Sequence, residues 1–203
     1  MRNENIWEIK ATNTPLLKRK CNRCNTNSFY CSEKFRINAQ KKNIDIWLIY
    51  RCVKCNSTYN MTLFSRIKPE LLGKDLYNKF LENDTEIAWK YAFSAEISRK
   101  NNVELDFKSV EYDILYDTIS VEDILNSDSE IVTFKIKYPY DFNLKLSSFV
   151  RICLQISATK LNKLIEAKVI SIQEKYLHKK HKVKNEDIVQ INIEKLKSVY
   201  TKL

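Results

Sequence analysis

The 203-residue sequence contains one glycine, Gly73, and this scarcity excludes whole classes of protein. Walker A loops and GxGxxG turns need several glycines where the backbone approaches a phosphate group. Nucleotide-driven and Rossmann-type functions are therefore not expected. Histidine is almost as rare, because only His178 and His181 are present. Catalytic triads that use histidine and catalytic metal sites with several histidine ligands are therefore not expected.

Long apolar segments are also missing. No run of eighteen apolar residues occurs, and the first ten residues, MRNENIWEIK, lack the apolar core of a signal peptide. We therefore expect no membrane partner and a cytoplasmic location. In a reducing cytosol, six cysteines that include two close pairs indicate metal binding or catalysis in preference to disulfides.

The net charge of +10 is distributed unevenly. Residues 1–68 hold 14 Lys and Arg against 4 Asp and Glu, residues 69–142 hold 8 against 16, and residues 143–203 hold 13 against 5. Two basic ends thus flank an acidic middle. Charges can simply solvate a surface, but segregation on this scale favours ends that bind a polyanion around a central scaffold.

Hydrophobic periodicity predicts an α+β protein with three parts. In residues 1–68, the stretches SFYCSEKFRINAQ, IDIWLIYRC and STYNMTLFSR predict a three-stranded antiparallel unit, with Ile46, Leu48 and Tyr50 on one face of the middle strand. Residues 69–142 form an acidic α+β connector, with one helix after Pro69, a second capped by Asp84, and then strands in SVEYDILYD and EIVTFKIKYP. Residues 143–203 predict helix, helix, strand, strand and a basic tail.

The two Cys-x-x-Cys pairs predict a structural zinc site. Cys21 and Cys24 are separated by two residues, as are Cys52 and Cys55, and 27 residues lie between the pairs. In a zinc ribbon each pair sits on a tight turn, here called a knuckle, and two knuckles complete a tetrahedral shell of four thiolates that leaves no place for a reacting water. A redox function would need a pair at the start of a helix, whereas both pairs adjoin predicted strands.

The remaining cysteines fit a core better than a metal site. Cys31 lies in an apolar strand and Cys153 on the apolar stripe of a helix, and of the two Cys31 is the more plausible spare ligand. Basic and aromatic residues crowd the predicted ribbon, and this combination suits RNA. We expect most of the aromatic rings to pack in the core and the lysines and arginines to bind. We therefore take Arg36, Lys41 and Lys42 as candidate RNA-binding residues.

The span CNRCNTNSFYCSEKFRINAQKKNIDIWLIYRCVKCNSTYN, with the preceding IWEIKATNTP, resembles a bacterial family catalogued as domain of unknown function 1062. Paired Cys-x-x-Cys motifs flank a core of the type FR-NA-K-DVWLIY in that family. The resemblance extends over most of the chain. It implies no reaction.

The segment LKLSSFVRICLQISATKLNKLIEAKVISIQEKYLHKKHKVKNEDIVQINI is similar to the RNA-binding domain named after small-subunit ribosomal protein S-four. The resemblance implies an ααββ fold that binds RNA. Where that family has turn glycines this chain has Lys168, Glu174 and Glu186, and we expect Asn185 to take the left-handed conformation of the last turn. The matching positions are Leu146–Leu154, Ser157, Leu164–Ile165, Ile170, Ile172, the tract around Lys179 and Lys182, and Asp187 before Val189 and Ile191.

Physical chemistry supports RNA binding by this segment independently. Ser157 is placed to cap a helix whose positive N-terminal end suits phosphate, and exposed cations surround it. A purely structural helical hairpin is the alternative. The candidate RNA-binding residues here are Lys145, Arg151, Ser157, Lys160, Lys163, Lys179, Lys180 and Lys182.

Together these features predict a non-catalytic, cytoplasmic RNA-binding protein with structural Zn²⁺. Ribosomal or transfer RNA, and the ribosome itself, are the expected partners, by analogy with both kinds of module. Three alternatives remain open at this stage. They are a zinc-ribbon DNA-binding regulator, a zinc-stabilised protein-interaction adaptor, and an RNA-modifying enzyme that would use carboxylates such as Asp45, Asp84 and Asp113.

Overall fold

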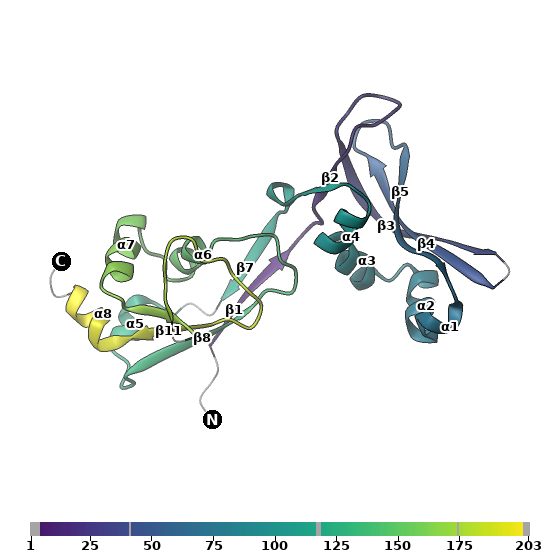
Figure 1. Ribbon diagram of the computed structural model, residues 1–203. Coiled ribbons are helices and arrows are strands. Elements are labelled where there is room, and N and C mark those ends of the chain that lie inside the picture. The colour runs from purple at the N-terminus through teal and green to yellow at the C-terminus, as the bar shows by residue number, and fades with distance from the viewer. Residues whose placement is uncertain (1–4, 41, 117–118, 174, 201–203) are drawn as a thin grey trace. The chain divides into compact units, whose positions relative to one another are not determined.

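A computed structural model describes residues 5–40, 42–116, 119–173 and 175–200 (Figure 1). The chain divides into two compact units. The inserted unit is Thr12–Glu111, and the terminal unit combines Met1–Ala11 with Tyr112–Leu203. Helices and sheets occur in both, so the protein is α+β as predicted.

The inserted unit is built on a five-stranded sheet in the order β5-β4-β3-β2-β6. Its neighbours pair antiparallel, which confirms the three-stranded arrangement predicted for β3, β4 and β5. Side chains of β4 alternate as expected, because Ile46, Leu48 and Tyr50 are fully buried while Trp47 and Ile49 are half-buried. The strands are β2 (Leu16–Lys18), β3 (Ser28–Gln40), β4 (Asn43–Cys52), β5 (Thr58–Ile67) and β6 (Glu104–Asp106).

Helices cover the buried face of this sheet. Phe80, Ala88 and Ala92 pack into the same apolar cluster as Leu48 and Met61. The helical region is divided into α1 (Pro69–Leu72), α2 (Lys74–Glu82), α3 (Thr85–Ala92) and α4 (Ala95–Lys100), with a short 3₁₀ turn η1 (Phe107–Ser109) near the end of the unit.

Two single helices were expected over residues 69–101, and each is in fact broken. Gly73 has φ +76°, a conformation that other residues rarely adopt, and it separates α1 from α2. Ser94 separates α3 from α4, because its hydroxyl accepts a hydrogen bond from the Ile97 N–H at 3.2 Å and so starts a new helix. The predicted cap is confirmed, since Asp84 accepts from the Ile87 N–H at 2.9 Å.

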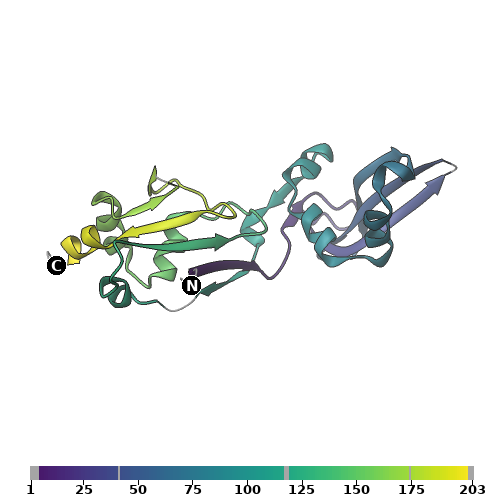
Figure 2. The same ribbon diagram turned by 90° about the horizontal axis from the view of Figure 1, so that it is seen from below.

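The terminal unit is built on a six-stranded sheet in the order β10-β9-β11-β8-β1-β7 (Figure 2). Strand β1 pairs parallel with β8 and antiparallel with β7, so the inserted unit occupies the turn of a β1–β7 hairpin. The strands are β1 (Asn5–Ala11), β7 (Tyr112–Tyr116), β8 (Ile131–Lys137), β9 (Ile170–Ile172), β10 (Lys175–Tyr176) and β11 (Ile188–Asn192). The helices are α5 (Val121–Leu125), α6 (Leu146–Cys153), α7 (Ala158–Glu166) and α8 (Ile193–Tyr200).

The expected boundaries at 68/69 and 142/143 differ from this division of the chain. Strand β1 belongs with β8 because it completes that sheet, and the helices after Pro69 belong with β3–β5 because they cover their buried face. The predicted helix, helix, strand, strand order is present as α6, α7, β9 and β11, whereas the expected basic tail is largely the helix α8.

The last turn of the terminal unit also differs from expectation. Glu186, with φ +66°, takes the left-handed conformation that was expected for Asn185. The side chain of Asn185 instead accepts a hydrogen bond from the Tyr138 N–H at 2.7 Å. Lys168 has φ +54°, and Glu174 lies outside the described residues. In the described part of the chain, no helix has the length and apolar character needed to cross a membrane.

Trp7 joins β1 to the core of the terminal unit. Its ring stacks on Phe134 of β8 at 4.0 Å and meets Phe149 of α6 edge-on at 5.8 Å, and only 1% of its surface is exposed. We expect Trp7→Ala to lower the free energy of unfolding by about 3–5 kcal/mol, because large buried side chains leave costly cavities. Urea unfolding followed by circular dichroism tests this, with Trp7→Phe as the milder control. Equal midpoints for wild type and Trp7→Ala would contradict the assignment of β1 to this core.

Candidate metal centre and basic surfaces

The two Cys-x-x-Cys pairs form knuckles with the same backbone geometry. Asn25 and Asn56 follow the pairs with φ of +59° and +56°, and asparagine tolerates this left-handed conformation well. The Asn25 N–H donates to the Cys21 carbonyl at 3.1 Å, and the Asn56 N–H donates to the Cys52 carbonyl at 3.0 Å. The first knuckle lies between β2 and β3 and the second between β4 and β5, so sheet pairing brings them together.

The four cysteine sulfurs form one compact cluster. Their Sγ atoms all lie within 4.8 Å of one another. The separation is 3.6 Å between Cys21 and Cys55 and 3.4 Å between Cys24 and Cys52. A tetrahedral shell with metal–sulfur bonds of about 2.3 Å has sulfur–sulfur edges of about 3.8 Å. The cluster therefore fits a metal ion held by four thiolates, as the spacing predicted.

Hydroxyl groups from the knuckles support the thiolate form of two cysteines. Ser57 Oγ lies 3.1 Å from the Sγ of Cys21, and this hydrogen bond, together with weaker ones from the backbone of Arg23 and Cys24, lowers the pKa of Cys21 to about 6. Thr26 Oγ1 lies 3.3 Å from the Sγ of Cys24 and likewise lowers its pKa. Burial raises the pKa of Cys52. Because a metal ligand must be a thiolate, the site is partly prepared for a cation.

Ser57 and Thr26 were not among the residues predicted for this site. The signal was nevertheless present, because the repeated unit is longer than the cysteine pair. It reads Cys-x-x-Cys-Asn followed by Thr in the first knuckle and by Ser in the second. Asparagine supplies the left-handed turn and the hydroxyl residue contacts sulfur.

The other two cysteines stand apart from the cluster. Cys31 and Cys153 are buried, and burial raises the pKa of each thiol to about 12. Both therefore stay protonated at neutral pH. Neither belongs to the group of four sulfurs.

Each of the three carboxylates named as possible catalytic groups lies in a different part of the fold. Asp84 caps α3, and Asp45 Oδ1 accepts from the Arg66 N–H at 2.8 Å. Asp113 is exposed on β7 of the terminal unit.

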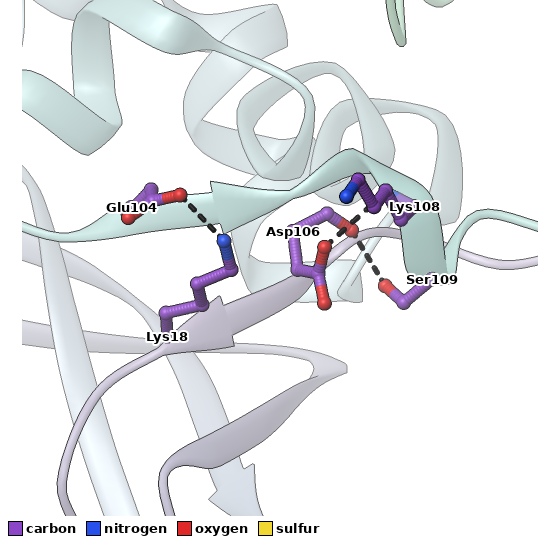
Figure 3. Close-up of polar contacts among 5 residues, drawn as sticks. All are labelled: Lys18, Glu104, Asp106, Lys108 and Ser109. Atoms are coloured by element: carbon purple, nitrogen blue, oxygen red, sulfur yellow. Dashed lines mark hydrogen bonds and ion pairs between the residues drawn. The ribbon is translucent and has the colours of Figure 1, made fainter.

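Cations surround the knuckles. Arg19 lies over the ring of Tyr59 with 4.2 Å between the guanidinium carbon and the ring centroid. A hollow of about 330 Å³ beside the first knuckle is lined by Arg19, Lys20, Asn22, Arg23, Phe29, Ser57, Thr58 and Tyr59. Lys18 is different, because its ammonium pairs with Glu104 of β6 at 2.6 Å, next to the Asp106–Ser109 turn (Figure 3).

The basic loop of the terminal unit brings predicted residues together. Lys145, at the N-cap of α6, and Lys182 occupy opposite positions of a short β bridge. Lys182 Nζ donates to Asn143 Oδ1 at 2.6 Å, and Lys179 and Lys180 are exposed in the same loop.

The predicted residues of α6 and α7 have different surroundings. Ser157 caps α7 as predicted, accepting from the Lys160 N–H at 3.1 Å. The Lys160 ammonium lies 3.9 Å from the ring centroid of Tyr200 in α8, whereas Lys163 and Arg151 are exposed.

The candidates in the inserted unit lie on or beside β3. Arg36 lies opposite Trp47 of β4, and Lys42 is exposed in the β3–β4 turn. Lys41 lies outside the described residues.

A family model described as "Protein of unknown function (DUF1062)" matches residues 37–176 of the chain. That span contains the second knuckle, the helices of the inserted unit and most of the terminal unit. Comparisons with curated proteins and with solved structures gave no match.

The cluster leads to a prediction about metal content. We expect one metal ion per chain, and Cys24→Ala/Cys55→Ala to lower this close to zero because two of the four ligands are lost. Native mass spectrometry under reducing conditions measures the content. Cys31→Ala is the control and should keep the ion. An ion retained by the double variant, or lost from Cys31→Ala, would argue against this ligand set.

Proposed function

The chain belongs to the DUF1062 family, whose function is unknown, and we propose that it is a non-catalytic, cytoplasmic RNA-binding protein with a structural zinc ion. Its ligand is structured RNA of the ribosomal or transfer class. Basic surfaces on both units supply contacts to phosphate. The two units together bind one RNA more tightly than either alone, because the second contact is intramolecular.

The observation that carries this proposal is the pairing of Lys145 with Lys182. These residues are distant in sequence, yet a β bridge places them side by side at the start of α6. Lys179 and Lys180 extend the same cationic surface. Two like charges held together are unfavourable unless an anion is bound, and RNA phosphates supply closely spaced anions.

Nearby acids do not neutralise this surface. Glu186 is engaged by Lys135 at 2.6 Å. Asp187 is buried, and its carboxylate accepts from the Lys184 N–H at 2.9 Å. Both acids of the loop therefore serve the fold. Lys182 donates to an amide oxygen, and none of the four lysines forms an ion pair within the described part of the chain.

The order of elements supports an S-four type domain within the terminal unit. Helices α6 and α7 precede β9 and β11, and Ser157 caps α7. Left-handed φ at Lys168 and Glu186 supplies two of the three turns for which that family uses glycine. In this reading Lys163 and Arg151 add phosphate contacts, while Lys160 is shared between RNA and the ring of Tyr200.

Zinc is the metal that best suits the sulfur cluster. Four thiolates in tetrahedral arrangement are typical of structural zinc, and a filled shell leaves no position for substrate. We therefore assign Cys21, Cys24, Cys52 and Cys55 a structural role in a zinc-ribbon-like head. The ion holds the basic knuckles, and with them Arg23 and Lys54, in one place.

Zinc removal tests that role. Chelation under reducing conditions should abolish hydrogen-exchange protection at the Asn25 and Asn56 amides. Their hydrogen bonds to the Cys21 and Cys52 carbonyls form within the knuckles, which the zinc ion holds in place. Re-addition of Zn²⁺ should restore the protection, and Mg²⁺, which prefers oxygen ligands, should not. Amides of β11 in the terminal unit are the internal reference. Unchanged protection after complete zinc removal would refute the structural role.

RNA binding is tested with purified protein and a labelled transfer RNA. We expect affinity to fall steeply with salt, and Lys145→Glu/Lys182→Glu to reduce the slope of log K against log salt by about 1.4–1.8, for two lost phosphate contacts. Fluorescence anisotropy over a range of KCl concentrations provides the slope. Lys74→Glu/Lys90→Glu makes the same change in charge on exposed positions of α2 and α3 and is the matched control.

Three results would count against the proposal. Absence of RNA binding would refute it directly. Equal or tighter binding of duplex DNA would favour a DNA-binding regulator. Equal slopes for the two double variants would remove Lys145 and Lys182 from the binding surface.

A further inference from the structure

The sheet of the inserted unit has one face that its helices do not bury. Along β4 the side chains alternate between full burial and partial exposure. Phe80, Ala88 and Ala92 of the helices pack on the buried side, where Leu48 and Tyr50 point. Trp47 and Ile49 lie on the opposite side, called the open face, and both are partly accessible to solvent.

Three cross-strand rows make up this open face, and each contains one cation. Opposite residues in neighbouring strands point to the same side of a sheet. Two of the rows also contain an aromatic ring. The rows are Tyr30–Arg51–Thr58, Lys34–Ile49–Asn60 and Arg36–Trp47–Thr62.

The acidic side chains of this region accept hydrogen bonds from groups other than the cations of the open face. Residues 12–68 contain twelve Lys and Arg but only two acids, Glu33 and Asp45. Glu33 lies in a β-bulge and its carboxylate accepts a hydrogen bond from Trp89 Nε1 of α3 at 2.6 Å. Asp45 accepts from the Arg66 N–H. Lys34, Arg36 and Arg51 form no ion pair with any acid in the described part of the chain.

The open face is connected to the metal centre at one end. Tyr30 Oη donates to Asn56 Oδ1 of the second knuckle at 3.1 Å. The Val53 N–H of that knuckle donates to the Ser28 carbonyl of β3 at 3.2 Å, and Arg51 directly precedes Cys52. The metal centre thereby fixes the position of the first row.

We propose that this open face is the surface on which the protein holds unpaired nucleotides of its RNA. The inference rests on the proposed RNA-binding function and assigns it a ligand class, a single strand or loop. Bases stack on the rings of Trp47 and Tyr30, and the phosphates between them contact Lys34, Arg36 and Arg51. Stacking of this kind needs bases that are free of a duplex.

Charge and shape together favour RNA over an acidic protein. An acidic peptide would satisfy the three cations, but its Asp and Glu side chains carry no aromatic ring that could stack on Trp47 and Tyr30. A single strand offers both features in alternation, because every nucleotide carries one base and one phosphate. On the open face the two outer rows each hold a ring beside a cation, and the row between them holds a cation without a ring.

Substitutions of Trp47 and Tyr30 test the stacking step. We expect Trp47→Leu and Tyr30→Leu each to weaken binding of a fluorescein-labelled oligouridine by about 5- to 100-fold, since one stacked base is lost. Trp47→Phe and Tyr30→Phe keep an aromatic ring and should retain most of the affinity. Anisotropy gives the affinities, and circular dichroism with zinc content verifies that each variant is folded.

Substitution of the arginines tests the phosphate contacts. Arg36→Gln/Arg51→Gln should reduce the salt slope for oligouridine by about 1.4, for two phosphates of a single strand. Lys10→Gln/Lys137→Gln removes two exposed cations from the sheet of the terminal unit and should leave the slope unchanged.

The outcomes separate this inference from the proposed function. If transfer RNA binds but oligouridine does not, or if Trp47→Leu binds oligouridine as wild type does, the open face is not the single-strand surface, although the RNA-binding function stands. If neither RNA binds, both fail. Poly-glutamate that binds as tightly as oligouridine, with the same loss in Arg36→Gln/Arg51→Gln, would overturn the assignment in favour of an acidic protein partner.

Discussion

The close approach of four cysteine sulfurs is the constraint on which the inserted unit depends. Cys21 and Cys52 are buried in the core of the inserted unit, whereas the residues between the cysteines of each pair are exposed. Thiolates within 4.8 Å of one another repel unless a cation lies among them. A metal ion bound by the four cysteines would replace this repulsion with a link between the two knuckles, which join β2 to β3 and β4 to β5.

Local patterns made much of this molecule predictable from its sequence. The cysteine spacing identified the two knuckles because each is completed within six residues. Alternation in β4 identified its buried face, and Asp84 and Ser157 marked helix starts, because a cap needs only a few neighbouring amides. Each of these features is specified by residues close together in the chain.

Features set by distant residues were not predictable in the same way. Strands β2 and β6 have three residues each and are recognisable only through their pairing across the inserted unit. The sequence showed many cations, but it could not show that Lys18 is paired with Glu104, that Lys160 faces Tyr200, or that Lys145 meets Lys182. Asparagine tolerates the left-handed conformation, so Asn185 was a reasonable prediction for the last turn. Its side chain instead accepts a hydrogen bond from the Tyr138 N–H, and Glu186 takes the left-handed conformation.

The parallel pairing of β1 with β8 also sets an order of events during synthesis. β1 is made before the inserted unit, whereas β8, its parallel partner, begins at Ile131, after the whole inserted unit has been made. All strands of the inserted unit have been synthesised once the chain reaches Asp106, so this unit is able to fold first. At that point Phe134, on which the Trp7 ring stacks, has not yet been made. A nascent chain of this topology therefore presents the apolar side chains of β1 without their partners on β8 and α6 until the inserted unit has been made.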